Sequence, residues 1–177
     1  MSRVTPPLLP EQRLEKVLGV ARADALGVFV CAGASVLVSG AQEDWIMCGF
    51  SLLALVAGGM EWHGYQRLRD RDLGGLQWLL GAQGCLYTVI AAYALWRLQH
   101  FNAMAYWAEL PEEARTQIDE QLKQNGLNAD TDRALLLRTM NFLVCTVLIF
   151  VSTLYQGGLT WFYRRHRGAI AEALHGK

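Results

Sequence analysis

The chain has 177 residues, of which 53% are hydrophobic and 18% are charged, and its formal net charge is zero. Soluble domains have about 25% charged residues, so the composition argues against an ordinary soluble protein. A zero net charge also gives no general attraction for nucleic acid, and we expect no nucleic-acid partner.

The N-terminal segment, residues 1–24, is polar and begins with a proline-rich run. It has no apolar stretch next to the start, so it does not resemble a cleaved signal peptide. Within it, one side of a helix would be apolar, formed by Leu14, Val17, Leu18 and Ala21. The pattern predicts an amphipathic helix that lies on the inner leaflet of a membrane.

Four windows farther along the chain are almost free of charge: 25–42, 45–65, 73–96 and 139–163. Each approaches or exceeds the roughly 20 apolar residues that cross a bilayer as a helix. Helices of a soluble bundle would show a polar outer face, and these windows show none. The sequence therefore predicts an all-α integral membrane protein with four transmembrane helices.

The distribution of Arg and Lys predicts the orientation of these helices, because such residues are enriched in cytoplasmic segments. One side would hold Arg3, Arg13, Lys16, Arg22, Arg67, Arg69, Arg71, Arg164, Arg165, Arg167 and Lys177. The other side would hold Arg97, Arg115, Lys123, Arg133 and Arg138. We therefore expect both termini, the basic loop 66–72 and the basic tail 164–177 in the cytoplasm. Segment 97–138 would be outside, in the periplasm if the membrane is a bacterial inner membrane.

The outer segment has its own helical pattern over 111–125, which we consider a possible surface for a protein partner. Pro111 suits a first helical turn, and Asn125-Gly126 suits a helix end, with Leu127 placed for a hydrophobic contact. The aromatic stretch before it is typical of an interfacial continuation of the third helix. Asp130 or Asp132 could cap the helix that leads into the fourth span.

Small and polar residues recur along one stripe of each predicted span. The stripes are Gly27, Cys31, Ser35 and Ser39; Ser51, Gly58, Glu61 and Tyr65; Gln77, Gly81, Gly84, Thr88 and Ala91; and Asn141, Cys145, Ser152, Gln156 and Tyr163. Such stripes are typical of helix packing in membranes, and their spacing predicts a left-handed bundle. Alternatively, two stripes line a polar pathway, with Gln77, Gln83, Asn141 and Gln156 as candidate lining residues.

Glu61 is the most informative single residue, because an ionisable group inside a span is costly and is often functional. His63 is two positions away and would point to nearly the opposite side of the helix. We expect Glu61 to contact an Arg of the third or fourth helix, or Gln156. Its role would be an inter-helix contact, the binding of an ion, a proton or a ligand, or that of a plain residue at the membrane interface.

Two arginine clusters follow the second and fourth spans: Arg67, Arg69 and Arg71, and Arg164, Arg165 and Arg167. We expect them to contact anionic lipid headgroups or a protein partner. In an oligomer they could also form a cytoplasmic ring that selects anions.

In size, four spans and a larger second outer loop, the chain resembles the DsbB family of disulfide-forming membrane enzymes. That resemblance covers topology only, because disulfide exchange needs reactive cysteine pairs at the outer surface. Here Cys31, Cys48, Cys85 and Cys145 lie inside the predicted spans, and no C-x-x-C occurs. Histidine spacing typical of a haem or metal site is also missing. We therefore expect no catalytic residues, no bound metal and no cofactor.

These observations favour a homo-oligomeric channel or transport-type protein, with the third and fourth helices lining the pathway. The alternative is a non-catalytic membrane anchor, assembly or regulatory component of a larger complex. A haem- or quinone-linked redox membrane protein is the third possibility.

Overall fold

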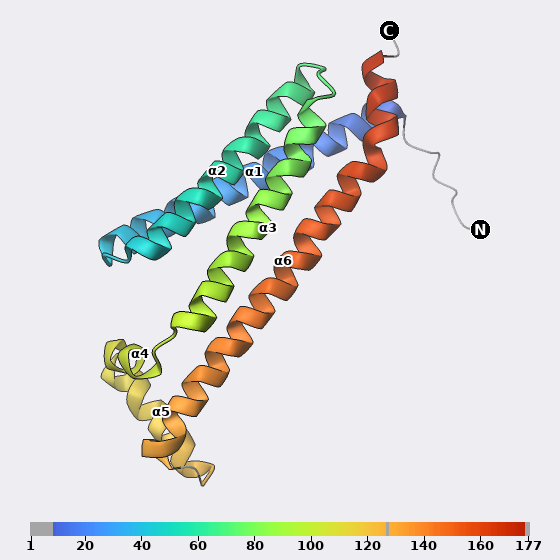
Figure 1. Cartoon of the computed structure of the whole chain (residues 1–177). Helices are drawn as coiled ribbons and strands as arrows, with labels where there is room; N and C mark the ends of the chain where they lie inside the picture. The colour runs from blue at the N-terminus through green and yellow to red at the C-terminus, as the bar shows by residue number, and fades with distance from the viewer. Residues whose placement is uncertain (1–8, 127, 176–177) are drawn as a thin grey trace, which may run out of the picture. The chain divides into compact units, whose positions relative to one another are not determined.

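The computed structural model describes residues 9–126 and 128–175, and all secondary structure in this part of the chain is helical. Its six helices are α1 (Pro10–Ala41), α2 (Trp45–Arg69), α3 (Gly75–His100), α4 (Ala103–Glu109), α5 (Glu112–Gln124) and α6 (Ala129–His175) (Figure 1). The chain divides into two compact units. The first unit contains the residues up to Ile90 together with those from Ser152 onward, and the second unit is Ala91–Val151.

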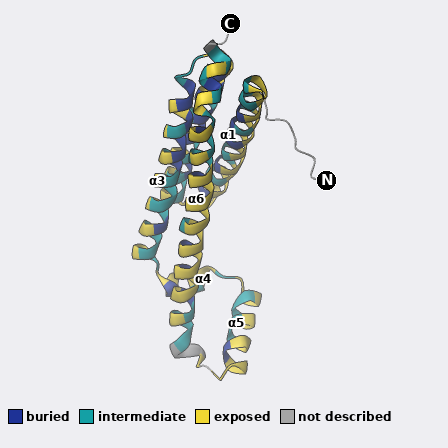
Figure 2. Ribbon diagram, turned by 90° about the vertical axis from the view of Figure 1, so that its right-hand side faces the viewer, coloured by how far each residue is buried: buried dark blue, intermediate teal, exposed yellow. Residues whose placement is uncertain are grey.

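Four helical segments are long and apolar enough to cross a membrane: Pro10–Ala41, Trp45–Arg69, Gly75–His100 and Asp132–Leu174. Each overlaps one of the four predicted windows, which confirms the all-α class and the four candidate spans. Their outward surfaces are strongly apolar: Leu37 is 76% exposed, and Phe142 and Leu154 are each 61% exposed. Exposed residues follow the outer face of α6 along its length (Figure 2). Lipid would cover these side chains without the cost that water imposes on apolar surface.

The core of the first unit is formed by Val17 and Ala21 of α1 with Tyr65 and Leu68 of α2, and further by Leu76, Leu79, Tyr163 and Ile170. We expected an amphipathic helix on the inner leaflet within residues 1–24, and in the structure residues 10–24 are the first part of α1. Their apolar face exists, but it packs against the other helices, and α1 continues through this segment without a break.

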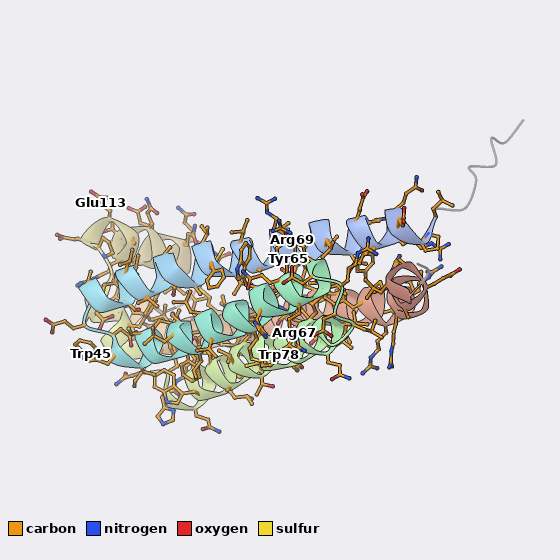
Figure 3. All side chains as sticks on the ribbon, turned by 90° about the horizontal axis from the view of Figure 1, so that it is seen from above. Trp45, Tyr65, Arg67, Arg69, Trp78 and Glu113 are labelled. Carbon is orange, nitrogen blue, oxygen red and sulfur yellow. The ribbon has the colours of Figure 1, made fainter. Side chains whose placement is uncertain are left out.

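Helices α1 and α2 form an antiparallel hairpin with a three-residue connection (Figure 1). The Asp44 carboxylate accepts a hydrogen bond of 2.9 Å from the Met47 amide and so caps α2. Farther along the hairpin, the Ser51 hydroxyl donates to Ser35 Oγ at 2.8 Å. Trp45 and Tyr65 mark opposite ends of α2 (Figure 3).

Helices α2 and α3 approach most closely at Gly64 and Gly75. A Cβ atom at Gly75 would lie 2.5 Å from the carbonyl oxygen of Gly64 and 2.6 Å from the amide nitrogen of Leu68. A Cβ atom at Gly64 would lie 2.9 Å from the carbonyl oxygen of Gly75. Only residues without a side chain allow the two backbones to approach so closely.

In the second unit, α3 ends at His100 and does not continue through the aromatic stretch, contrary to our expectation. Asn102 separates α3 from the next helix, because its side-chain oxygen accepts hydrogen bonds from the amides of Met104 and Ala105, at 3.1 and 3.2 Å, and so caps a new helix. This cap begins the short helix α4 with a new direction of the chain.

Helix α5 begins one residue later than predicted, since Pro111 is its N-cap rather than part of its first turn. It ends before Asn125, and Gly126 has a φ of 71°, which is the left-handed conformation predicted for a helix end. Asp132 accepts a hydrogen bond from the Asn128 amide at 2.9 Å near the start of α6. Arg3, Leu127 and Lys177 are outside the described residues, and the side chain of Asp130 is not described either. The predicted contact of Leu127 and the predicted cap at Asp130 therefore lie outside the described part of the chain.

Helix α6 is longer than the predicted fourth span 139–163, because it continues through the basic segment to His175. Arg164, Arg165 and Arg167 are therefore arranged on a helix and not on an irregular tail.

Candidate functional site

Glu61 is 1% exposed and lies inside the first unit on α2. Its Oε1 atom accepts a hydrogen bond of 2.9 Å from Gln83 Nε2 and one of 3.3 Å from the Tyr163 hydroxyl. The expected partners, an Arg or Gln156, do not form these bonds. An amide and a phenol instead supply the donors that a buried carboxyl group needs.

Asp24 of α1 is the second carboxyl group of this cluster, and it is 8% exposed. Its Oδ2 atom accepts a hydrogen bond of 2.9 Å from the same Gln83 Nε2, and its Oδ1 atom accepts one of 2.7 Å from the Tyr155 hydroxyl. One amide nitrogen therefore joins two acidic side chains from different helices. We call Asp24, Glu61, Gln83, Tyr155 and Tyr163 the acidic cluster.

The acidic cluster has no basic counterpart among the side chains that the structure describes. Their ion pairs join Arg67 to Asp72 and Arg133 to Asp119, and neither pair includes Asp24 or Glu61. Two negative charges that share one donor repel strongly where the effective dielectric constant is low. The arrangement therefore favours uptake of a proton or another cation.

A groove of about 330 Å³ lies beside the cluster, between α3 and α6. Its lining residues are Gln83, Gly84, Tyr87, Thr153, Gln156, Gly157 and Thr160. The Oε1 atoms of Gln83 and Gln156 are buried and have no hydrogen-bond partner in the described part of the chain. Because buried acceptors without a donor are costly, these two oxygen atoms beside the groove would gain from a donor or a positive charge.

The four predicted lining residues have different surroundings. Gln83 and Gln156 line the groove together. Gln77 is exposed and lines a different hollow of the first unit with Arg164 and Arg167. Asn141 belongs to the second unit, where its side-chain oxygen accepts a hydrogen bond from Arg97.

Two of the four predicted stripes face the protein interior along their length. All the stripe residues of α2 and of α6 are buried: Ser51, Gly58, Glu61, Tyr65, Asn141, Cys145, Ser152, Gln156 and Tyr163. In α3 the predicted stripe does not face the interior of the described chain, because Gln77, Gly81, Gly84 and Thr88 are exposed while Leu76, Leu79, Ala82, Gln83 and Leu86 are buried. In α1, Ser39 is buried, whereas Gly27 and Cys31 are exposed.

The arginines of the predicted lipid or partner surfaces differ in their surroundings. Arg67 pairs with Asp72 in the turn between α2 and α3, whereas Arg69 and Arg71 are exposed. Hydrogen bonds from the Gly74 amide and from Arg67 hold the pKa of Asp72 below its ordinary value. In α6, the Arg165 guanidinium lies 5.0 Å from the centre of the Trp161 ring.

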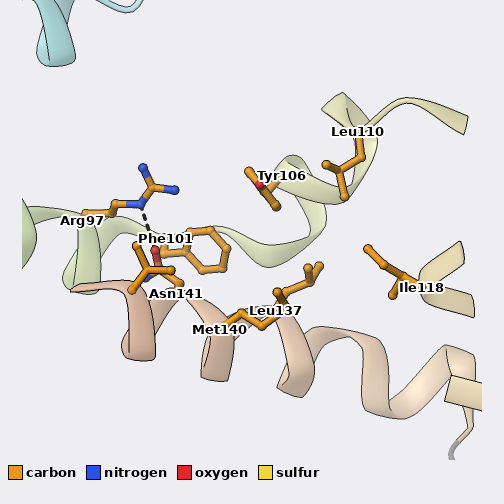
Figure 4. Close-up of a pocket in the computed structure, with 9 residues that line it drawn as sticks. Arg97, Phe101, Tyr106, Leu110, Ile118, Leu137, Met140 and Asn141 are labelled. Atoms are coloured by element: carbon orange, nitrogen blue, oxygen red, sulfur yellow. Dashed lines mark hydrogen bonds between the residues drawn. The ribbon is translucent and has the colours of Figure 1, made fainter. Parts of the chain in front are cut away.

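The second unit contains a pocket of about 150 Å³ with one charged group at its edge (Figure 4). The Nε atom of Arg97 donates to the Asn141 side-chain oxygen at 2.9 Å, and an Nη atom donates to the Tyr93 hydroxyl at 2.8 Å. The other walls are apolar or aromatic: Phe101, Tyr106, Leu110, Ile118, Leu137, Met140 and Val144.

Histidine and cysteine side chains occupy separate surroundings. The His63 ring packs edge-on against Trp78, with ring centres 4.8 Å apart, and His166 Nδ1 lies 2.8 Å from the Phe162 carbonyl oxygen. The four cysteines are free thiols, and only Cys145 is buried. Among the described residues, no group of three or more His, Cys, Asp or Glu is placed to hold a metal ion.

Comparisons with protein families, with curated proteins and with solved structures found no match for this chain. The class of protein is therefore inferred from the fold and the site alone. The described chain is all-α, has four helices apolar enough to span a membrane, and contains two buried carboxyl groups, Asp24 and Glu61, joined by Gln83 beside a groove between α3 and α6.

Proposed function

We propose that the protein is a small multi-pass membrane protein of the transport type, which binds a proton or a small cation at the acidic cluster. One observation supports this proposal above the others. Gln83 joins the two carboxyl groups through its Nε2 atom, its buried Oε1 atom has no partner among the described residues, and the same residue is part of the groove wall between α3 and α6. A cation in the groove is thus one side chain away from two acidic groups.

The chemistry of the groove fits a cation better than an anion. The side chains of Gln83, Gln156, Thr153 and Thr160 contribute carbonyl and hydroxyl oxygens, which replace part of the hydration shell of a cation. An ionisable group inside a span commonly marks an ion path or a proton relay. Glu61 and Asp24 would then provide the charge, and Gln156 would contact the ion.

The direct test is flux into liposomes that contain purified protein, with dyes that report protons and monovalent cations. We expect Glu61→Gln and Gln156→Ala each to reduce flux at least tenfold. Gln66→Ala is the matched control, because Gln66 is exposed on α2 and does not line the groove. Flux that is unchanged in both variants would leave Glu61 and Gln156 with a packing role only.

The proposal includes subunits that share the pathway, because one chain of four spans encloses little polar volume. The exposed stripe of α3, formed by Gln77, Gly81, Gly84 and Thr88, is where a second copy would pack closely. Native mass spectrometry in detergent measures the subunit number, and a strict monomer would contradict a shared pathway.

We further propose a bacterial inner membrane as the location, with both termini in the cytoplasm, since lysine and arginine are concentrated on that side. Reporter fusions at the connection 42–44 and at residue 120 measure which segments reach the periplasm. A cytoplasmic signal at residue 120 would overturn this orientation.

The second candidate function is a docking or assembly component. It is favoured by the hollow of about 540 Å³ that Arg164 and Arg167 line with Leu73, Gly74, Leu76, Gln77 and Leu80. The outer helix at 111–125 would be another contact surface. Purification under mild conditions, followed by loss of a co-purifying protein in Arg164→Gln/Arg167→Gln, would support this candidate over transport.

A further inference from the structure

The Arg97 pocket of the second unit plays no part in the proposed transport site, and none of its lining residues belongs to the acidic cluster. It brings together side chains from four elements of the chain: the end of α3, α4 with its C-cap Leu110, α5 and α6. Figure 4 shows Arg97 bonded to Asn141 beside Phe101, with Tyr106, Leu110 and Ile118 farther along the pocket.

The guanidinium group of Arg97 is held in place but not neutralised. Asn141, which is 6% exposed, accepts from Nε, and Tyr93 accepts from one Nη atom. Both partners are uncharged acceptors, and Arg97 forms no ion pair with a described carboxylate. The remaining N–H groups form a fork that suits the two oxygens of a carboxylate.

The rest of the pocket suits a hydrocarbon chain. Leu137 is 3% exposed and forms part of the interior, whereas Met140 and Val144 on α6 are 51% and 58% exposed. A cavity of about 150 Å³ holds a group the size of a benzene ring, so it admits the first methylenes of one chain. The exposed Met140 and Val144 would then contact the remainder of that chain outside the pocket.

We propose that this pocket binds a single-chain anionic amphiphile, namely a long-chain fatty acid. Its carboxylate pairs with Arg97, and its first methylenes lie against Phe101, Leu137 and Met140. The small volume favours one chain over the two chains of a phospholipid. Charge complementarity favours the acid over an uncharged lipid, because a neutral headgroup would leave the guanidinium without a counter-ion.

The experiment measures binding of radiolabelled oleate to the full-length protein in phosphatidylcholine nanodiscs. We expect one oleate for each chain, with affinity at least tenfold weaker in Arg97→Gln, because a charge-assisted pair contributes about one tenfold factor or more. Arg138→Gln is the matched control: Arg138 is exposed on α6 in the same unit and does not line the pocket. Methyl oleate, which lacks the charge, should not compete.

A second variant keeps the test independent of any folding defect in Arg97→Gln. Val144→Trp leaves Arg97 intact but fills the exposed side of the pocket, and it should weaken oleate binding by a similar factor. Equal oleate affinity in the wild-type protein and both variants would overturn the proposal. Competition by methyl oleate as strong as that of oleate would overturn it as well. Stronger competition by dioleoyl phosphatidylglycerol than by oleate would overturn the single-chain assignment.

Discussion

Asp24 and Glu61 accept hydrogen bonds from the same atom, Gln83 Nε2, at 2.9 Å each. The two acidic residues belong to adjacent helices of a hairpin, and the donor comes from a third helix. A tyrosine hydroxyl from α6 bonds each carboxyl group on another side: Tyr155 with Asp24 and Tyr163 with Glu61. All four long helices therefore meet at one polar cluster, and a single amide is the donor that its two carboxyl groups share.

The first prediction concerns that amide. Gln83→Leu keeps a side chain of comparable volume but removes the donor that Asp24 and Glu61 share. Leaving buried polar groups unsatisfied costs about 1–3 kcal/mol, so we expect a clear decrease in the midpoint of thermal unfolding in detergent. Gln77→Leu is the control, since Gln77 is exposed on the same helix. An equal midpoint for the two variants would show that Gln83 contributes no specific stability.

The second prediction concerns the crossing of α2 and α3. Gly75→Ala would place a methyl group 2.5 Å from the carbonyl oxygen of Gly64, and the backbones would have to separate. Such overpacking costs about 1–3 kcal/mol or more, and thermal unfolding monitored by size-exclusion chromatography measures it. Gly59→Ala is the matched control, because no atom lies within 4 Å of the added Cβ there. That variant should be as stable as the wild type or slightly more stable, since alanine favours a helix.

The hydropathy of the sequence is sufficient to predict the four spans, but not the partner of Glu61. Glu61 is recognisable because it interrupts an apolar run, whereas Asp24 directly precedes the predicted span 25–42 and resembles an ordinary flanking residue. Tyr163 belongs to the polar stripe predicted for the fourth span, but the stripe does not identify Glu61 as its partner, and Tyr155 belongs to none of the predicted stripes. The sequence does contain one indication that Asp24 lies within a packed helix. The apolar face continues from Val17 through Ala21 to Ala25, and this face extends the helix past Asp24.

The face that α3 buries shows a second limit of sequence reasoning. Its small residues Gly81 and Gly84 and its leucines Leu79 and Leu86 form two stripes with nearly the same spacing. In water the leucine stripe would be buried by default, but in lipid neither stripe is excluded from the outer surface, and small residues are the usual contact. Spacing alone therefore cannot determine which stripe faces the bundle and which remains for a partner.

The third prediction concerns the contact between α5 and α6. Both oxygens of Asp119 accept hydrogen bonds from Arg133 Nη2, at 2.8 and 3.0 Å, and the same guanidinium lies 4.1 Å from the centre of the Trp107 ring. Asp119→Asn removes the charge from a partly buried pair, which typically contributes about 1 kcal/mol. We expect several-fold faster hydrogen exchange across Glu112–Gln124. Glu120→Gln changes an exposed neighbour, and identical exchange in the two variants would exclude a role for the ion pair.

The fourth prediction concerns pH and the turn between α2 and α3. The Gly74 amide donates to Asp72 Oδ1 at 2.7 Å, and Arg67 Nε donates to Oδ2 at 2.7 Å, so the pKa of Asp72 lies below its ordinary value of 3.8. A lowered pKa in the folded state means that the unfolded chain binds the proton more readily. The stabilisation by Asp72 is therefore fully present above pH 3.8 and is lost as the pH falls through the lower, folded-state value. The unfolding midpoint of the wild type should exceed that of Asp72→Asn at neutral pH, and the difference should shrink as the pH falls below 3.8. Asp70→Asn tests an exposed carboxylate in the same turn. A difference between wild type and Asp72→Asn that stays constant down to the lowest pH would contradict this role of the ionised carboxylate.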